Sequence, residues 1–557
     1  MTDAMAGADL PELVARARRH ASETPDKKFL VFQDGPSIVS LTYADLWARA
    51  TGFASGLSAR GVQQGDLVVL FLPQGADVYA VFLACLMVGA RPCIMAPPTP
   101  KQDVGTYYAN NSVLLDRIGP KLIVTGPDLV QAFCANLPAH ASVLAEPSSL
   151  AAGEGEAIGA DADGIAFLQF SSGTTALKKG VLLPHRSVNA QCRLYAERIG
   201  LTQDDVIVTW LPLYHDMGLI ACFILPLWAG ATVVAMDNYH WLARPRRLLD
   251  LAATYRATLM WLPNFAFNYL AQRVSGEACD LSSLRAVINC SEPCRPASHH
   301  AFEERFAAWG LRSHVTQTCY AMAEATFAVS QSIIGQPCAE ISVDPDALDK
   351  GEVVVTTPDT GMRLISSGVP LPGFDLTLVD DNRMPLGAGR LGEIAIRGPS
   401  LAEGYFRDVD TTARLFTADG LYYTRDLGFM HEGQLYVLGR QDDVLIVFGR
   451  KLRAPELESA LGGIPGIKPG RLIVLGRAGD SIGTNELYLL YEPENPDSAA
   501  EDIAFAARGI LLSTAGLSFR QIFRVDAGSL IKTTSGKISR SANGRLLTQL
   551  IAAGETT

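Results

Sequence analysis

The chain has 557 residues, of which 48% are hydrophobic and 19% are charged, and its formal net charge is −11 at pH 7. This length exceeds what one hydrophobic core organises, so we expect at least two domains, and the composition excludes a disordered chain. The acidic balance argues against a nucleic-acid-binding surface, which requires a basic stripe.

Helical patterns alternate with short apolar segments through most of the chain. Helices are expected at 41–58, 78–90 and 246–255, and buried strands at 66–72, 120–125, 231–236 and 259–262. Strand, helix and strand at this spacing predict an α/β fold with parallel sheets that helices cover on both faces. We expect two such sheets in a large N-terminal domain.

The pattern changes after about residue 353. The segments VVVTTP, FDLTLVDD and GEIAIRG are typical of short strands between turns, which predicts a barrel-like subdomain over about 353–438. The turn GAGRLG (387–392) matches a dinucleotide-binding pattern, but a strand follows it where a helix is required, so we interpret it as a hairpin turn. A further α/β pattern begins near Gly439. We therefore expect a large N-terminal domain (1–438) and a small, mobile C-terminal α/β domain (439–557).

Ten cysteines are scattered along the chain, and only Cys290 and Cys294 are close neighbours. No second pair completes a zinc site, so we interpret the cysteines as free thiols of a cytoplasmic protein without a signal peptide. Residues 219–236 are uncharged, but Pro226 and Gly230 interrupt them. A buried helix, a turn and a strand are expected there, and not a membrane span.

One segment has the composition of a phosphate-binding loop. Residues 171–180 are SSGTTALKKG, between the strand-like segments IAFLQF and VLLPH. Backbone N–H groups in such a turn converge on an anion, the hydroxyl groups add donors, and Lys179 adds positive charge. A polar hairpin with surface lysines is the alternative interpretation.

This segment resembles the phosphate loop of the acyl-activating, adenylate-forming family, which includes acyl-CoA synthetases, luciferases and peptide-synthetase adenylation domains. Further segments match that family's motifs in order along nearly the whole chain. They are WLPLYHDMGL (210–219), NCSEPCRP (289–296), CYAMAEAT (319–326), GEIAIRGPSLAEGYF (392–406), YYTRDLG (422–428), GRQDDVLIVFG (439–449) and KTTSGKISR (532–540). The segments LPLYHDMGL, AEAT and SVDPDAL are most similar to the fatty acyl-AMP ligase branch, whose members usually supply carrier proteins.

The resemblance implies a nucleotide site made of residues from several motifs. The implied ligands are Ser172, Gly173, Thr174, Thr175 and Lys179 for the phosphates, Tyr320 for adenine, Asp426 for the ribose and Arg440 beside the nucleotide. The cofactors implied are ATP, which becomes AMP by way of an acyl-adenylate, and Mg²⁺.

The resemblance also implies catalytic, pocket and hinge residues. Lys537 would bridge the carboxylate and the α-phosphate, Glu324 would hold Mg²⁺, His215 and Pro263, Asn264 and Phe265 would lie near the acyl pocket, and Asp442 would be the hinge. The partners implied are a hydrophobic carboxylic acid and the pantetheine thiol of coenzyme A or of an acyl carrier protein.

Several positions depart from the family pattern at the nucleotide motifs. Ala176, Ala321, Cys290 and Arg425 stand where glycine is usual, and Lys178 stands where proline is usual. Three hypotheses follow. The chain is a complete two-step ligase, or it only forms thioesters from an acyl-adenylate that a separate adenylating enzyme makes, or it is a catalytically silent nucleotide-binding regulatory protein.

Overall fold

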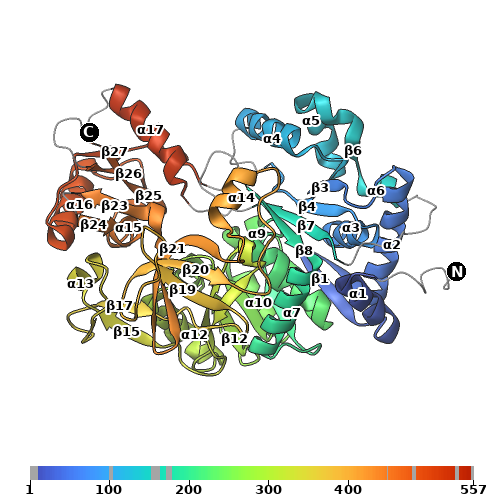
Figure 1. Cartoon of the computed structure of the whole chain (residues 1–557), viewed down its shortest axis with the longest axis horizontal. Coiled ribbons are helices and arrows are strands. Elements are labelled where there is room, and N and C mark those ends of the chain that lie inside the picture. The colour runs from blue at the N-terminus through green and yellow to red at the C-terminus, as the bar shows by residue number, and fades with distance from the viewer. Residues whose placement is uncertain are drawn as a thin grey trace.

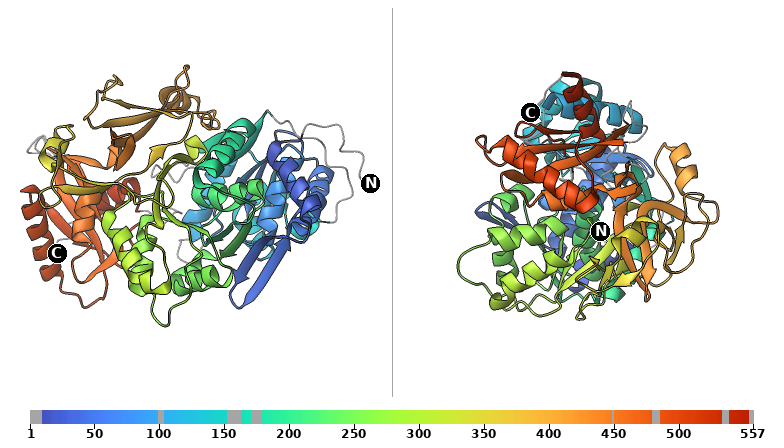
Figure 2. Two further views of the ribbon diagram at one scale, coloured as in Figure 1. Left: turned by 90° about the horizontal axis from the view of Figure 1, so that it is seen from below. Right: turned by 90° about the vertical axis from the view of Figure 1, so that its left-hand side faces the viewer.

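A computed structural model describes residues 10–98, 104–151, 163–170, 179–447, 450–478, 485–532 and 538–553. The N-terminal part (residues 10–440) contains the large sheets, and the C-terminal part (residues 444–553) lies at the opposite end of the long axis from the N-terminus (Figures 1 and 2). One hydrophobic cluster extends from Leu13 to Leu438, and separate clusters begin at Val447 and Ile473. The boundary at 438/439 stays a prediction.

The largest sheet has nine strands in the order β18-β14-β13-β12-β11-β9-β10-β1-β2. Their bounds are β1 Lys28–Asp34, β2 Ser37–Thr42, β9 Val206–Thr209, β10 Thr232–Met236, β11 Leu259–Leu262, β12 Ala286–Asn289, β13 Thr316–Ala321, β14 Ala328–Gln331 and β18 Val369–Pro370. The six strands from β13 to β1 in this order are parallel, while β2, β14 and β18 pair antiparallel at the two edges. The predicted strands at 231–236 and 259–262 are confirmed as β10 and β11.

A second parallel sheet has the order β4-β3-β5-β6. Its strands are β3 Leu67–Phe71, β4 Arg91–Ile94, β5 Leu122–Thr125 and β6 Leu144–Ala145, so the strands predicted at 66–72 and 120–125 are confirmed. The predicted helices are α2 Tyr43–Ala59, α3 Ala76–Met87 and α10 Arg246–Thr254. Helix α2 begins where Thr42 forms a capping box with Asp45, each side chain accepting from the other residue's backbone N–H at 3.0 Å.

The uncharged segment 219–236 is confirmed as buried helix, turn and strand. It contains a π-helix, η2 Met217–Ile224, then α8 Leu225–Ala229 and β10, and Gly230 ends the helix with φ +81°. Within the described ranges, no helix combines the length and the apolar character that crossing a membrane requires.

Two small antiparallel sheets follow residue 340. One has the order β16-β15-β17, with β15 Glu340–Val343, β16 Val355–Thr356 and β17 Met362–Ile365, and the other is β19-β20-β21-β22, with β19 Asp375–Val379, β20 Gly392–Arg397, β21 Tyr422–His431 and β22 Gln434–Arg440. The segment GAGRLG lies in the turn that leads into β20, which confirms that it is not a dinucleotide-binding loop.

The C-terminal part contains a three-stranded sheet with helices. Its elements are β23 Val444–Val447, β24 Arg450–Arg453, α15 Ala454–Leu461, β25 Ile467–Ala478, β26 Asn485–Pro493, α16 Ala500–Ala515, β27 Gln521–Arg524 and α17 Arg540–Ala553. Strands β25 and β26 pair antiparallel, and β26 and β27 pair parallel. The predicted α/β class is therefore confirmed for both parts of the chain.

A buried ion pair ties together the starts of three parallel strands. Asp205 precedes β9, Thr258 precedes β11, and Arg285 precedes β12. The Asp205 carboxylate is 5% exposed and accepts from Arg285 Nε at 2.9 Å, Arg285 Nη2 at 3.0 Å and Thr258 Oγ1 at 2.6 Å. Burial opposes the charge, but the donors from Arg285 and Thr258 hold the pKa of Asp205 below its usual value.

Asp205→Asn is expected to lower the free energy of unfolding by about 2 to 3 kcal/mol, because Arg285 loses its charged acceptor. Since the pKa of Asp205 is lower in the folded state, its contribution is present above the unfolded-state pKa of about 3.9 and disappears as the pH falls through the folded-state pKa. Urea denaturation of both proteins at pH 7 and pH 3.5 measures this difference. The neighbouring exposed Asp204→Asn is the control, and a difference that stayed equally large at pH 3.5 would contradict the assignment.

Candidate functional site

Three residues predicted to hold the nucleotide meet in one hydrogen-bonded network, in which Tyr320 and Asp426 are buried and the side chain of Arg440 is 52% exposed. Tyr320 Oη, at the end of β13, donates to Asp426 Oδ2 at 2.6 Å, and Arg440 Nε donates to Asp426 Oδ1 at 3.2 Å. Asp426 in β21 lies opposite Arg440 in β22 in the sheet register. The Asp426 backbone N–H donates to Thr424 Oγ1 at 3.0 Å, which in turn donates to the Ile394 carbonyl, so the carboxylate is held in place.

The electrostatics of this network keep its donors protonated. Burial, and then the Asp426 carboxylate, raise the pKa of Tyr320 well above its usual range. Asp426 and then Glu324 raise the pKa of Arg440 despite its partial burial. Tyr320 and Asp426 are 8% and 9% exposed. At neutral pH Tyr320 is therefore a neutral phenol and Arg440 a guanidinium.

Glu324 lies beside this network in the short helix η4 Ala323–Ala325, directly after β13. Its carboxylate is 8% exposed and accepts from Tyr405 Oη at 2.8 Å; Tyr405 Oη also lies 3.2 Å from Tyr422 Oη. The Ala402 N–H donates to the Glu324 carbonyl at 2.8 Å, which attaches η4 to the segment that carries Tyr405. The motifs AEAT and AEGYF therefore form one rigid unit.

Of the predicted phosphate ligands in the loop, Lys179 lies within the described residues. Strands β7 Ile165–Phe170 and β8 Gly180–Pro184 pair antiparallel on either side of the loop, as the sequence predicts. Lys179 Nζ lies 5.1 Å from the centre of the Tyr405 ring, and burial lowers its pKa while Glu324 opposes that shift. Ser172, Gly173, Thr174 and Thr175 lie outside the described residues, as do Ala176 and Lys178.

Glu324 also fits the predicted magnesium role. In the described part of the chain, no group of three or more His, Cys, Asp or Glu residues forms a metal site. Mg²⁺ commonly binds proteins through one or two carboxylates and takes its other ligands from substrate phosphates and water. One buried carboxylate beside Lys179 suits an ion of that kind, which would be held jointly by the protein and the nucleotide.

The predicted acyl-pocket residues do not form a single unit. Asn264 begins helix α11 Asn264–Arg273, and its Oδ1 accepts from Asn289 Nδ2 at 2.9 Å and from the Arg295 N–H at 3.1 Å, so it supports the segment 289–296. Phe265 is 38% exposed, and its ring lies edge-on to Trp210 and Trp241. Pro263 is buried at the start of α11.

An aromatic cluster adjoins the motif that contains His215. Trp210 and Trp241 stack with ring centres 3.8 Å apart and planes 4° apart. His215 is half-buried in the turn before the π-helix η2, with its ring 5.0 Å from that of Tyr214. Segments of π-helix are frequent at functional sites. The role of His215 at the acyl group stays a prediction.

Lys537 lies outside the described residues, but its surroundings are described. Lys532 and Ile538 form an isolated bridge at the base of the segment that contains it. Burial and Arg471 lower the pKa of Lys532 to about 8, while Glu492 and Glu292 oppose this shift. Glu292 of the N-terminal part therefore acts electrostatically on Lys532 in this arrangement.

The described departures from the family pattern differ in their backbone. Ala321 and Cys290 have no positive φ, so neither needs the conformation that favours glycine. Arg425 has φ +63°, in the left-handed region. Its side chain is 41% exposed, and Nη2 donates to Asp442 Oδ1 at 2.5 Å.

Sequence reasoning assigned no role to Tyr405, although it quoted the motif that contains it. The sequence feature that could have indicated Tyr405 is the glycine directly before it. Gly404 has a φ of +129°, and the side chain of Tyr405 that follows reaches Glu324 in η4. Glu393 was also missed: its Oε1 accepts from the Arg425 N–H at 2.8 Å.

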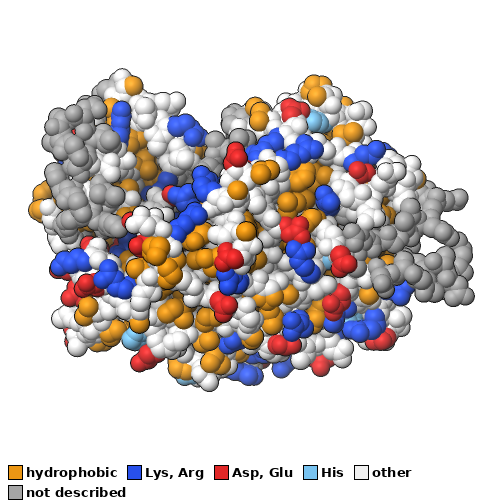
Figure 3. All heavy atoms as spheres, in the orientation of Figure 1, with side chains coloured by type: hydrophobic (Ala, Val, Ile, Leu, Met, Phe, Trp, Pro, Cys, Tyr) orange, Lys and Arg blue, Asp and Glu red, His pale blue; other side chains and the backbone are white. Residues whose placement is uncertain are grey.

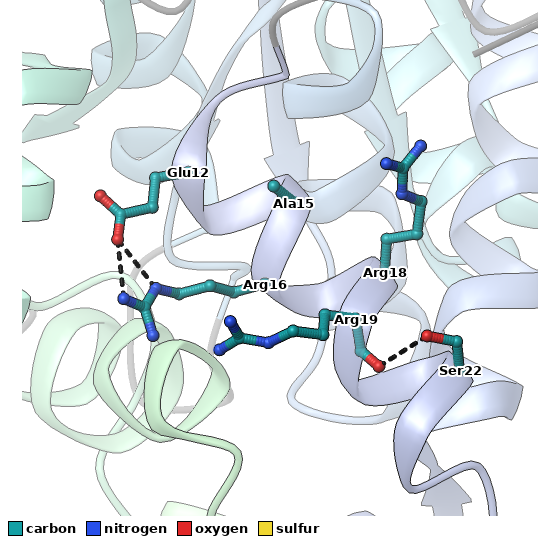
Figure 4. A pocket seen from close by; sticks show the side chains of 6 residues that line it. All are labelled: Glu12, Ala15, Arg16, Arg18, Arg19 and Ser22. Atoms are coloured by element: carbon teal, nitrogen blue, oxygen red, sulfur yellow. Dashed lines mark hydrogen bonds and ion pairs between the residues drawn. The ribbon is translucent and has the colours of Figure 1, made fainter. Parts of the chain in front are cut away.

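A recess of about 460 Å³ lies elsewhere on the surface, beside helix α1 Glu12–Glu23 (Figure 4). Three arginines line it, and Arg16 lies 3.7 Å over the Trp228 ring and pairs with Glu12 at 2.8 Å. Helix α1 and strand β21 lie toward opposite ends of the molecule (Figure 1), so the recess is separate from the candidate site.

The chain is similar to known proteins along nearly its whole length. The family described as AMP-binding enzyme matches residues 17–406. A putative fatty-acid–CoA ligase of Mycobacterium tuberculosis is 30% identical over 94% of this chain and 95% of its own length. A medium-chain fatty-acid–acyl-carrier-protein ligase of Moorena producens is 29% identical over 93% and 91%. A solved structure from studies of fatty acyl-adenylate ligases from E. coli and L. pneumophila aligns with a TM-score of 0.90 at 27% identity, covering 98% of this chain and 99% of that one.

Proposed function

The chain belongs to the family of AMP-binding enzymes and is an acyl-activating ligase, and from this premise we propose that it joins a hydrophobic carboxylic acid to a pantetheine thiol through an acyl-adenylate. The observation that carries this proposal is the hydrogen-bonded network of Tyr320, Asp426 and Arg440 with the buried Glu324 beside it. The network combines a ribose acceptor, a cation and a metal-binding carboxylate within one site.

Asp426 would accept the ribose hydroxyl groups. A carboxylate offers about four lone-pair sites, and Tyr320 and Arg440 occupy one on each oxygen, so acceptor positions remain for two hydroxyl donors. Tyr320, oriented by its bond to Asp426, would present its ring to the adenine base. This arrangement binds the nucleoside half of ATP.

Lys179, Arg440 and the hydroxyl groups of the loop at 171–178 would bind the phosphates. Mg²⁺, held by Glu324 and the phosphates, would supply charge neutralisation at the phosphoryl oxygens. Tyr405, which donates to Glu324 Oε1, would leave Oε2 as the oxygen available for that role. Preorganised charges of this kind stabilise the transition state without reorganising during the reaction.

The reaction has two steps. A carboxylate oxygen of the acid attacks the α-phosphorus of ATP, forming the acyl-adenylate and releasing pyrophosphate, and Lys537 would neutralise the reacting oxygens. The sulfur of the pantetheine thiol then attacks the acyl carbonyl carbon, the bond to AMP breaks, and the thiol proton is released. A rotation about Asp442 between these steps would withdraw Lys537 and admit the thiol.

The acyl group would be hydrophobic, since Phe265, packed against the buried and stacked Trp210 and Trp241, exposes apolar surface next to the motif of His215. The acceptor is coenzyme A or an acyl carrier protein. Of the two relatives described above, the Mycobacterium tuberculosis protein is named as a CoA ligase and the Moorena producens protein as an acyl-carrier-protein ligase. The ten cysteines are free thiols, which suits an ATP-dependent reaction in the cytoplasm. These relatives favour neither a silent protein nor a separate adenylating enzyme.

The proposal is tested by measuring the two half-reactions separately. A panel of aliphatic and aromatic acids is screened for ATP–pyrophosphate exchange, and synthetic acyl-adenylates are offered with coenzyme A or a holo carrier protein. We expect exchange with at least one hydrophobic acid and thioester formation from its adenylate. Thioester formation without exchange for any acid would mean that the first step is lost, and activity in neither assay would contradict the proposed function.

A further inference from the structure

Arg425 occupies a strained position directly beside the nucleotide carboxylate. Its φ of +63° lies in the left-handed region, which is less favourable for a residue with a side chain than for glycine. The Arg425 N–H donates to Glu393 Oε1 at 2.8 Å, so the backbone is held in this conformation. Strain of this kind persists where the surrounding structure maintains it, and it often marks a functional position.

The side chain that this backbone presents reaches the junction between the two parts of the chain. Arg425 Nη2 donates to Asp442 Oδ1, and Asp442 lies in the short helix η5 Gln441–Asp443 between β22 and β23. Both side chains are partly exposed, at 41% and 54%. Lysine and arginine side chains gather along the hollow between the C-terminal part and the rest of the molecule (Figure 3).

Asp443, the next residue in the junction, is attached to the C-terminal part of the chain. Asp443 accepts from Arg540 Nε, and Arg540 also pairs with Glu458 at 2.9 and 3.0 Å, so Asp443 is bound to the C-terminal part. Consecutive aspartates therefore attach the junction to both parts of the molecule. Asp442 is attached to the N-terminal part through Arg425, one residue from Asp426.

We propose that Arg425 is a positioning residue that, through Asp442, favours the orientation of the C-terminal part that supports adenylation. The inference rests on the proposed function and on a rotation at Asp442. In the present arrangement Arg295 Nη2 of the N-terminal part donates to the Pro455 carbonyl at 3.1 Å, Arg453 pairs with Asp349 at 3.5 Å, and Glu292 acts electrostatically on Lys532 at the start of the Lys537 segment. A rotation at the junction would move Asp442 relative to Arg425 and weaken their ion pair.

The expected size of the shift between orientations follows from the partial exposure of the Arg425 and Asp442 side chains. Since partly exposed ion pairs are weak and are screened by salt, losing this pair shifts the balance between orientations by about two- to fivefold. The departure from glycine at 425 thus affects the ratio of the two half-reactions and leaves both of them possible.

The test compares Arg425→Gly, Arg425→Asn, Asp442→Asn and the Arg425→Gly/Asp442→Asn double variant. Glycine and asparagine both tolerate the left-handed backbone, so neither substitution adds strain. The measured quantity is the rate of ATP–pyrophosphate exchange divided by the rate of thioester formation from a supplied acyl-adenylate. We expect each single variant to lower this ratio by about two- to fivefold and the double variant to lower it no further. The reversed pair Arg425→Asp/Asp442→Arg is expected to restore it.

Amide hydrogen exchange of residues 438–447 provides a readout that does not depend on activity. It is expected to become about two- to fivefold faster in each single variant, and in the wild type at high salt. An unchanged ratio with unchanged exchange would overturn the inference, as would additive effects of the two substitutions. A raised KM for ATP in Arg425→Gly alone would instead make Arg425 a phosphate ligand. If the wild type performs neither half-reaction, the proposed function fails, and the hydrogen-exchange result still decides whether Arg425 holds the junction.

Discussion

Lys537→Ala is expected to reduce ATP–pyrophosphate exchange by about 100- to 1,000-fold, the usual effect of removing one preorganised donor from a developing charge. Thioester formation from a supplied acyl-adenylate should stay close to the wild-type rate, because this lysine is needed only while the acid carboxylate and the α-phosphate react. Both rates are measured with the best acid from the panel. A large loss of ATP–pyrophosphate exchange together with a nearly unchanged rate of thioester formation is the diagnostic result.

Lys468→Ala is the matched control for this experiment, since Lys468 is an exposed lysine of the same C-terminal part. It should leave both rates unchanged. Equal losses of both half-reactions in Lys537→Ala would show that the lysine acts in the fold or in both steps. A thermal melting curve of each variant separates the first of these from the second.

Asp426→Asn is expected to lower ATP–pyrophosphate exchange at subsaturating ATP by about 10- to 100-fold, mainly through a higher KM for ATP. The amide retains the shape of the carboxylate but has only one oxygen, while Tyr320 and Arg440 both donate to this position. Its NH₂ group would face one of these donors, and the charge that attracts the ribose hydroxyls and Arg440 would be lost.

Asp419→Asn is the control for Asp426, because Asp419 pairs with Arg397 on the surface at 2.6 Å with 69% of its side chain exposed. Exposed pairs of this kind contribute little, so its KM for ATP should not change. Tyr320→Phe keeps the ring and removes only the hydrogen bond, so its loss should be smaller than that of Asp426→Asn. An unchanged KM for ATP in Asp426→Asn would exclude this carboxylate as the ribose acceptor.

The sequence predicted local elements well where the pattern was strong. The helix predicted at 41–58 is α2, Tyr43–Ala59, and the strand predicted at 66–72 is β3, Leu67–Phe71, since periodicity and caps act within a few residues. It did not predict a π-helix in 217–224, because that form shares the apolar pattern of an ordinary buried helix. The region from 340 to 440 forms two small antiparallel sheets, whose strand order local patterns do not specify.

For the candidate site too, the sequence predicted some features and left others to the tertiary structure. Motif order along the chain predicted Tyr320, Glu324, Asp426 and Arg440 as site residues, and the structure brings these four residues close together. It did not show that Tyr320 donates to Asp426, because 106 residues separate them, or that Tyr405 holds Glu324 across 81 residues. Such contacts depend on sheet order and register, which bring distant segments together.

The sequence by itself determined the α/β class, the adenylate-forming family and the residue types available for phosphate, ribose and metal, because these depend on local pattern and on chemistry that few residues can perform. Only the tertiary structure showed where the side chain of the unusual Arg425 lies. Its left-handed backbone and its hydrogen bond to Asp442 place it at the junction between the two parts of the chain. Backbone conformation and contacts between distant segments arise from the packed fold, which no local pattern records.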